Sequence, residues 1–312
     1  MELEPIIIDG KSGQVAYLND ELEMVERDVA TCARVVFDDK TSAFFVLNGS
    51  PRYARRHRRE TVVHTAADVH LDKLRTTIMH AFMTGRHAVS KKKLREAIAR
   101  NSIDAVSKTL VVAADTVQET LAEILPKTLV NVVISGGQAG LDILQRQMRS
   151  ASESEFRTAF IRKRFDAADP IVVEWARKHG AELAKDLSDT TRHNIADALV
   201  RAFENQDLRT LYDDVLNAVG DEKRATLIAR TEVMRAANAG QRESWRQAVD
   251  SGMLTGDEKR QWIVTNDERL CPECESLDGE VAELGGEYPD PGGEGPPLHP
   301  NCRCTEGIIY AA

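Results

Sequence analysis

Apolar residues recur every three to four positions through most of the chain, a spacing that places them on one face of an α-helix. Residues 102–125 show this pattern clearly up to Pro126, which we expect to end the helix. The same spacing predicts helices at about 20–37, 127–149, 170–185, 188–203 and 205–220, and one or two helices between 52 and 100. The pattern therefore predicts a mainly α-helical protein.

Glycines and a capping residue refine this picture. The 127–149 segment contains Gly136, Gly137 and Gly140, whose spacing does not fit a dinucleotide-binding turn. We expect either a close helix contact or a turn there. Asp221 can cap a long helix over about 222–249, which Gly252 ends.

Strand-like patterns are confined to the two ends of the chain. Residues 1–17 are irregular or strand-like, with a turn at 9–13. Short strands are predicted at 261–265, 280–281 and 307–310, around a loop rich in glycine, proline and acidic residues. The pattern thus predicts an elongated helical N-terminal and middle region followed by a small α+β module.

Composition narrows the function classes. The 312 residues carry a formal net charge of −9, which argues against a protein whose main role is to bind nucleic acid. No basic and apolar leader begins the chain, and no apolar run approaches the roughly 18 residues that span a bilayer. We therefore expect a protein that is made in a reducing cytoplasm and has no membrane partner.

One region departs from this acidic average. Between residues 52 and 100, thirteen Lys and Arg residues face four Asp and Glu residues. The densest cluster comprises Arg52, Arg55, Arg56, Arg58 and Arg59. It could contact DNA phosphates or an acidic partner, or it could simply be the solvated face of one or two helices.

Four of the five cysteines lie in the last 42 residues, next to a histidine. Cys271 and Cys274 form a C-x-x-C pair, and His299 and Cys302 have the same spacing, with Cys304 following. C-x-x-C is a common half-site for tetrahedral zinc. Cys271, Cys274 and Cys302 are the firmest candidate ligands, while His299 and Cys304 compete for the fourth position. Cys32, in contrast, stands alone in a helical pattern and is expected to be a core residue.

A structural zinc ion is the favoured interpretation of this cluster. A module of some 50 residues with few large apolar side chains cannot form a stable core alone, and an ion that clamps its loop would supply the missing stability. Disulfide pairing and free structural thiols are the alternatives. Neither a zinc-deaminase pattern nor an H-E-x-x-H motif is present, so we predict no enzymatic activity.

The long helix after Asp221 carries a stripe of small residues suited to close packing, with Glu232 at its centre. A buried carboxylate needs a partner. Arg235 could reach it from one turn away, and our sharper hypothesis is that Glu232 accepts hydrogen bonds from Arg303 of the C-terminal module. An exposed Glu232 is the alternative.

Several groups of residues together resemble the phage Mu F-like head morphogenesis family. They comprise Arg230, Glu232, Asn238 and Gly240 in the long helix, Trp262, Asp267 and Gly279 around the C-x-x-C pair, and Arg303 within the segment 296–304. Order, spacing and residue types agree over about residues 155–307. Residues 1–150 contain no motif that we can match.

The resemblance implies a minor capsid protein of a tailed bacteriophage with a structural role in prohead assembly, located inside the virion near the portal. The implied partners are the portal protein and the major capsid or scaffold protein, with packaged DNA possible through residues 52–100. The implied organisation is a variable contact region at 1–150 and a head morphogenesis domain at 151–312, whose metal-binding module spans 258–312. The alternatives are an internal DNA-associated protein ejected with the genome and, least favoured, an enzyme or toxin.

Overall fold

The computed structural model describes residues 4–8, 11–18, 32–37, 42–46, 51–100, 103–151, 164–204, 210–265 and 269–309. The chain divides into two compact units, Met1–Val62 and Val63–Ala312. The division near residue 150, which rests on where recognisable motifs begin, stays a prediction.

The N-terminal unit contains an antiparallel sheet in the order β1-β2-β3-β4. Its strands are Glu4–Ile8, Lys11–Leu18, Cys32–Phe37 and Ser42–Val46. The strand-like start of the chain is thus confirmed, but the helix expected to reach Phe37 is wrong over β3. Adjacent β-branched valines, Val35 and Val36, favour the strand, and the pairing of Val35 with Val15 and Ala43 places β3 between two partners. Cys32 accordingly lies on a strand and not on a helix.

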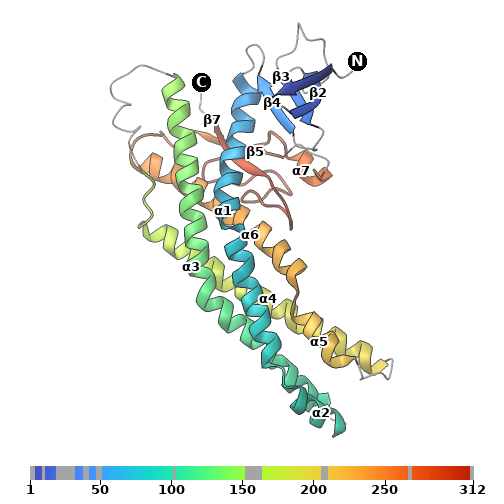
Figure 1. Ribbon diagram of the computed structural model, residues 1–312. Helices are drawn as coiled ribbons and strands as arrows, with labels where there is room; N and C mark the ends of the chain where they lie inside the picture. The colour runs from blue at the N-terminus through green and yellow to red at the C-terminus, as the bar shows by residue number, and fades with distance from the viewer. Residues whose placement is uncertain are drawn as a thin grey trace. The chain divides into compact units, whose positions relative to one another are not determined.

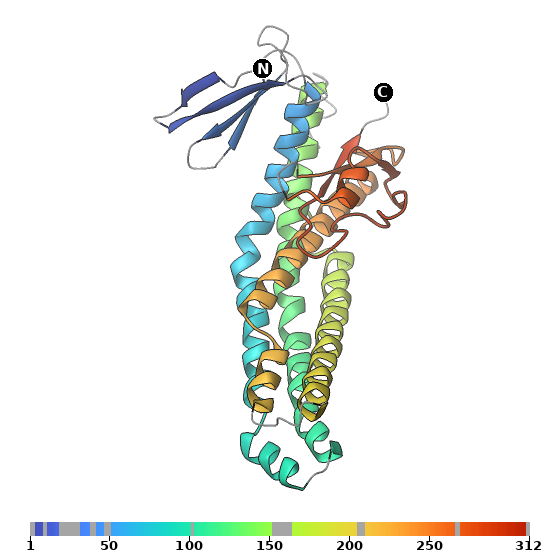
Figure 2. The ribbon, with the colours of Figure 1, turned by 90° about the vertical axis from the view of Figure 1, so that its right-hand side faces the viewer.

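The larger unit is built from helices that lie side by side, as Figures 1 and 2 show for α1, α3, α4 and α6. The helices are α1 Pro51–Ala88, α2 Lys91–Ala99, α3 Ile103–Ala151, α4 Pro170–Glu204, α5 Leu211–Val219 and α6 Glu222–Asp250. The predicted mainly α-helical fold is confirmed. Among the helices that the structure describes, none is both long and apolar enough to cross a lipid bilayer.

Two predicted helix ends do not exist. Helix α3 continues through Pro126, although proline removes one backbone hydrogen bond. Leu125 and Leu129 on either side are fully buried, and Gly180 of α4 leaves room for the proline ring. Helix α4 likewise continues through Ser188, which is buried and donates its hydroxyl to the carbonyl of Ala114 at 3.0 Å instead of capping a new helix.

The glycines of α3 form the close helix contact that the sequence allowed, because they lie where α3 meets α6. A Cβ added to Gly136 would lie 2.2 Å from the carbonyl oxygen of Ala237, and one added to Gly240 would lie 2.0 Å from that of Val133. Any larger residue would push the two backbones apart. The small-residue stripe of α6 is therefore the surface on which α3 packs.

The start and end of α6 agree with prediction. The Asp221 carboxylate accepts a hydrogen bond from the backbone N–H of Arg224 at 2.8 Å, which satisfies one free donor of the first turn. The helix ends at Asp250, and Gly252 follows with a φ of 72°, a value that favours glycine.

The C-terminal module follows as a three-stranded antiparallel sheet in the order β6-β5-β7. Its elements are β5 Lys259–Ile263, α7 Pro272–Ser276, β6 Val281–Glu283 and β7 Thr305–Ile309. All three predicted strands are present, each shifted by no more than two residues at its start. The module packs around Trp262, Leu277 and Tyr288 together with three of its cysteines.

Candidate metal centre in the C-terminal module

The short helix α7 positions the first two candidate ligands. Cys271 precedes the helix, and its sulfur accepts a hydrogen bond from the backbone N–H of Cys274 at 3.3 Å. Pro272 occupies the first turn, where its missing N–H costs nothing. The turn therefore directs both sulfurs to the same side, as a C-x-x-C half-site requires.

A tight turn before β7 supplies the other three. The backbone N–H of Cys302 bonds the carbonyl of His299 at 3.1 Å, and Asn301 between them has a positive φ of 64°. Asparagine tolerates this conformation better than most residues. Cys302 and Cys304 then lie just before the last strand, and both are buried.

The five side chains lie in one cluster around Cys274. Nε2 of His299 lies 3.0 Å from Sγ of Cys271 and 3.2 Å from Sγ of Cys274, and the sulfurs of Cys274 and Cys302 are 3.7 Å apart. Two sulfurs on one tetrahedral zinc ion would lie about 3.8 Å apart, given a zinc–sulfur distance of about 2.3 Å. A cavity of about 20 Å³ lies among these residues and all five line it. The donor set and the space thus suit a single ion.

Two overlapping groups share Cys274. The candidate ligand atoms of Cys271, Cys274 and His299 lie within 4.8 Å of one another, and so do those of Cys274, Cys302 and Cys304. The sequence left His299 and Cys304 as rivals for the fourth position, and the structure brings both to the cluster.

The orientation of His299 suits a ligand. Its Nδ1 donates to the carbonyl of Pro300 at 2.8 Å, so the neutral ring carries its proton there and leaves the lone pair of Nε2 directed at the sulfurs. Although burial acts against the charged ring, this hydrogen bond and the neighbouring cysteines raise the pKa of His299 overall.

The thiols differ strongly in acidity. Hydrogen bonds from the thiol and backbone of Cys304 lower the pKa of Cys302 to about 5, whereas the bond to Cys302 and burial raise the pKa of Cys304. Burial opposes ionisation of Cys271, but its hydrogen bonds with Cys274 and the charge of His299 outweigh burial and lower its pKa. Cys302 and Cys271 are therefore the sulfurs most ready to act as thiolates.

Polar residues of α6 hold the module in place. The side-chain amide of Asn238, which is fully buried, donates to the carbonyls of Pro296 and Cys304 at 3.3 and 3.2 Å, and its oxygen accepts from Thr305 at 2.7 Å. Thr231 accepts from the backbone N–H of Asn301 at 3.0 Å. The backbone on either side of Cys302, at Asn301 and at Cys304, is thus bonded to α6.

A buried ion-pair network, which the sequence interpretation missed, lies beneath the sheet. Glu306 is fully buried and pairs with Arg260 at 2.5 Å and Arg242 at 2.6 Å, and the Tyr288 hydroxyl donates to it at 3.2 Å. Burial and the Glu306 charge raise the pKa of Tyr288. The signal was available, because Arg260 and Trp262 are two residues apart on β5 and so share its inward face.

The predicted hydrogen bond from Arg303 to Glu232 is wrong. Glu232 is buried, but its carboxylate accepts from His179 of α4 at 2.6 Å and from Arg235 at 3.4 Å. Helix α4 packs beside α6 and presents His179 to Glu232, which sequence spacing could not reveal. The backbone carbonyl of Arg303 instead accepts from His64 at 2.7 Å and from Thr265 at 3.0 Å.

The remaining motif residues have separate roles. Gly279 adopts a φ of 86° and donates its N–H to the carbonyl of Trp262 at 3.1 Å, which closes the turn before β6. Trp262 is fully buried in the core of the module. Arg230 is exposed on α6. Asp267 lies outside the described residues.

The candidate DNA-contact arginines Arg52, Arg55, Arg56, Arg58 and Arg59 lie on the first turns of α1, but their side chains are outside the described part of the chain. The helices expected between 52 and 100 are confirmed as α1 and α2. Nucleic-acid contact by these residues stays a prediction.

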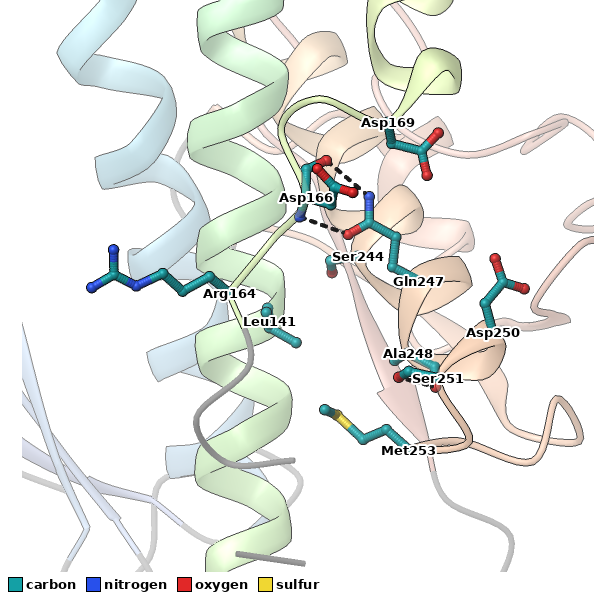
Figure 3. Close-up of a pocket in the computed structure, with 10 residues that line it drawn as sticks. All are labelled: Leu141, Arg164, Asp166, Asp169, Ser244, Gln247, Ala248, Asp250, Ser251 and Met253. Carbon is teal, nitrogen blue, oxygen red and sulfur yellow. Dashed lines mark hydrogen bonds between the residues drawn. The ribbon is translucent and has the colours of Figure 1, made fainter. Parts of the chain in front are cut away.

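A larger cavity of about 450 Å³ lies away from the cysteines, where α6 meets the segment before α4 (Figure 3). Asp166, Asp169 and Asp250 line it. The side-chain amide of Gln247 donates to the backbone carbonyl of Asp166 and accepts from its backbone N–H. Arg246 forms ion pairs with Asp169 and Asp250. The pair with Asp169 thus joins α6 to the start of α4, whereas Asp250 pairs within α6.

Comparison with known proteins gives one match. The family model described as "Phage Mu protein F like protein" matches residues 189–306. No curated protein and no solved structure matches the chain. The matched stretch contains α5, α6 and the C-terminal module through the middle of β7, together with the last half of α4.

Proposed function

Because residues 189–306 carry the phage Mu F-like module, which indicates a phage head morphogenesis protein, we propose that the chain is a minor head protein acting in prohead assembly at the portal. The family match is the observation that carries this proposal. In this role the protein is a structural part of the virion, near the portal in the capsid interior, and its partners are the portal protein and the major capsid or scaffold protein.

The second part of the proposal is a structural zinc ion in the C-terminal module. The five converging ligands and the small cavity support it, since all the candidate donors are protein atoms. Such a site leaves no open position for a reacting water, unlike a catalytic zinc site. Zinc would tie α7 to the turn before β7, and these two segments share only a small apolar core.

Packaged DNA is a second candidate partner. The basic character of residues 52–100 favours it, and the acidic C-terminal segment argues that any such contact belongs to α1 and α2. The lysines at the start of α2, Lys91, Lys92 and Lys93, are exposed. Salt-dependent binding that weakens when Arg55, Arg56, Arg58 and Arg59 are neutralised would support an internal, ejected protein.

Co-expression with the portal protein of the same phage, followed by affinity capture, tests the head assembly proposal. We expect the two proteins to co-purify in a fixed ratio, and quantitative mass spectrometry of purified virions to find a few copies of the chain. Proheads that assemble normally without the chain, and virions that lack it, would contradict the proposal.

Elemental analysis of the purified protein should find one zinc ion per chain.

A further inference from the structure

A second cavity, of about 490 Å³, adjoins the cysteine cluster within the larger unit. Helix α1, helix α6 and the C-terminal module each contribute to its walls. It shares His299 and Cys302 with the metal centre, whereas Cys271, Cys274 and Cys304 do not line it. We call it the arginine cleft. Its volume lies within the range of about 300–1,000 Å³ that is usual for small-molecule sites.

The charge of the arginine cleft is positive. Arg230, Arg269 and Arg303 line it, and among the described lining residues Asp68 is the one with a carboxylate. Guanidinium groups hold phosphate by pairs of parallel hydrogen bonds, which makes arginine the preferred residue for this anion. The walls therefore favour a ligand with a phosphate group.

The cleft also has apolar lining residues. Leu71 of α1 and Val233 and Met234 of α6 line it, and the last two are buried. Aliphatic and thioether groups pack well against flat aromatic rings, with the sulfur of methionine adding a favourable contact. A ligand that fits both features has a phosphate joined to a flat ring.

Arg230 distinguishes the arginine cleft from the ion pairs and hydrogen bonds described above, whose polar groups already bond one another. Its side chain is exposed and has no hydrogen-bond or ion-pair partner among the residues that the structure describes. It lies one helical turn from Val233 and Met234 on α6. Arg230 thus stands at the rim of the cleft with its hydrogen-bonding capacity available to a ligand.

We propose that the arginine cleft binds a nucleotide, with the guanidinium group of Arg230 on the phosphate and the base against Leu71, Val233 and Met234. A free nucleotide and one unit of a single DNA strand offer the same chemistry, and the experiment below distinguishes them.

Fluorescence anisotropy of a labelled twelve-residue oligothymidylate, with the metal-loaded full chain, measures the binding. Arg230→Gln should weaken it about tenfold, which corresponds to one lost charge-assisted hydrogen bond. Leu71→Asp, on α1, should weaken it at least as much, because it places a carboxylate against the base and adds negative charge to the cleft. Arg201→Gln removes the same charge from the exposed last turn of α4, outside the basic residues 52–100, and should leave the affinity unchanged.

Competition identifies the source of the nucleotide. Displacement of the probe by thymidine monophosphate supports a free nucleotide, and displacement by unlabelled oligonucleotide alone supports a DNA strand. Equal losses in Arg230→Gln and Arg201→Gln, or binding that does not saturate, would overturn the proposal. Zinc content, measured on every variant, and incorporation into virions test the proposed function separately.

Discussion

Helix α6 forms two contacts that differ in kind. Against α3 it presents Gly240, where a Cβ would lie 2.0 Å from the carbonyl of Val133, so this contact depends on the absence of side chains. Two residues earlier, Asn238 uses both ends of its amide on the C-terminal module. The contact with α3 is set by shape, and the contact with the module by hydrogen bonding. The helix bundle is therefore sensitive to added volume, and the module to lost polar or ligand groups.

The largest expected effect is on the module. The double variant Cys274→Ser/Cys302→Ser should abolish zinc binding and unfold residues 258–312, because metal binding in structural zinc sites contributes about 10 kcal/mol or more. Elemental analysis and limited proteolysis measure this. Helicity by circular dichroism should change little, since the helices lie elsewhere. Cys32→Ser, on β3 of the other unit, is the matched control and should keep its zinc.

The next effect concerns the buried ion pairs. Glu306→Gln should lower the free energy of unfolding by about 3–5 kcal/mol, because it leaves the buried guanidinium of Arg260 without its carboxylate. Urea unfolding followed by tryptophan fluorescence, to which the buried Trp245 and Trp262 both contribute, measures the loss. Glu283→Gln removes the exposed pair with Lys259 and should cost under about 1 kcal/mol. Similar losses in both variants would mean that the network contributes no more than a surface pair.

The helix crossing should respond to a single methyl group. Gly240→Ala is expected to lower the free energy of unfolding by about 3 kcal/mol, since a Cβ there meets backbone and cannot be relieved by a rotamer change. Gly285→Ala, which would meet nothing within 4 Å, should have a negligible effect in the same urea titration. A stabilised Gly240→Ala would show that α3 and α6 do not approach this closely.

The smallest effect lies where α4 meets α6. A double-mutant cycle of His179→Gln and Glu232→Gln should give a coupling of about 1 kcal/mol, because their bond at 2.6 Å is largely buried. The cycle of Glu232→Gln with Arg303→Gln should give a coupling near zero. Coupling in the second cycle and additivity in the first would support a bond between Glu232 and Arg303 in place of the one between Glu232 and His179.

Local signals in the sequence were enough for the helical fold and for the choice of candidate ligands. Capping by Asp221 and the ending of α6 follow from residue type and spacing, and the structure brings the C-x-x-C pair together with His299, Cys302 and Cys304. The predictions that the structure corrects depended on neighbours distant in sequence. Pro126 and Ser188 carry helix-ending signals, but packing between α3 and α4 overrides them. Glu232 does bond Arg235, as its spacing allowed, but its second partner, His179, comes from a helix whose rotation no local pattern gives.

The strand order β6-β5-β7 has a consequence for synthesis. Strand β5 is the middle strand, yet one of its neighbours, β7, is the last strand of the module to leave the ribosome. Until then Asn238 and Arg260 have no carbonyl, hydroxyl or carboxylate of residues 304–306 to bond. Since domains fold as the chain emerges, the helices can assemble early while the module waits with its cysteines exposed. Metal uptake would then coincide with the final step of folding.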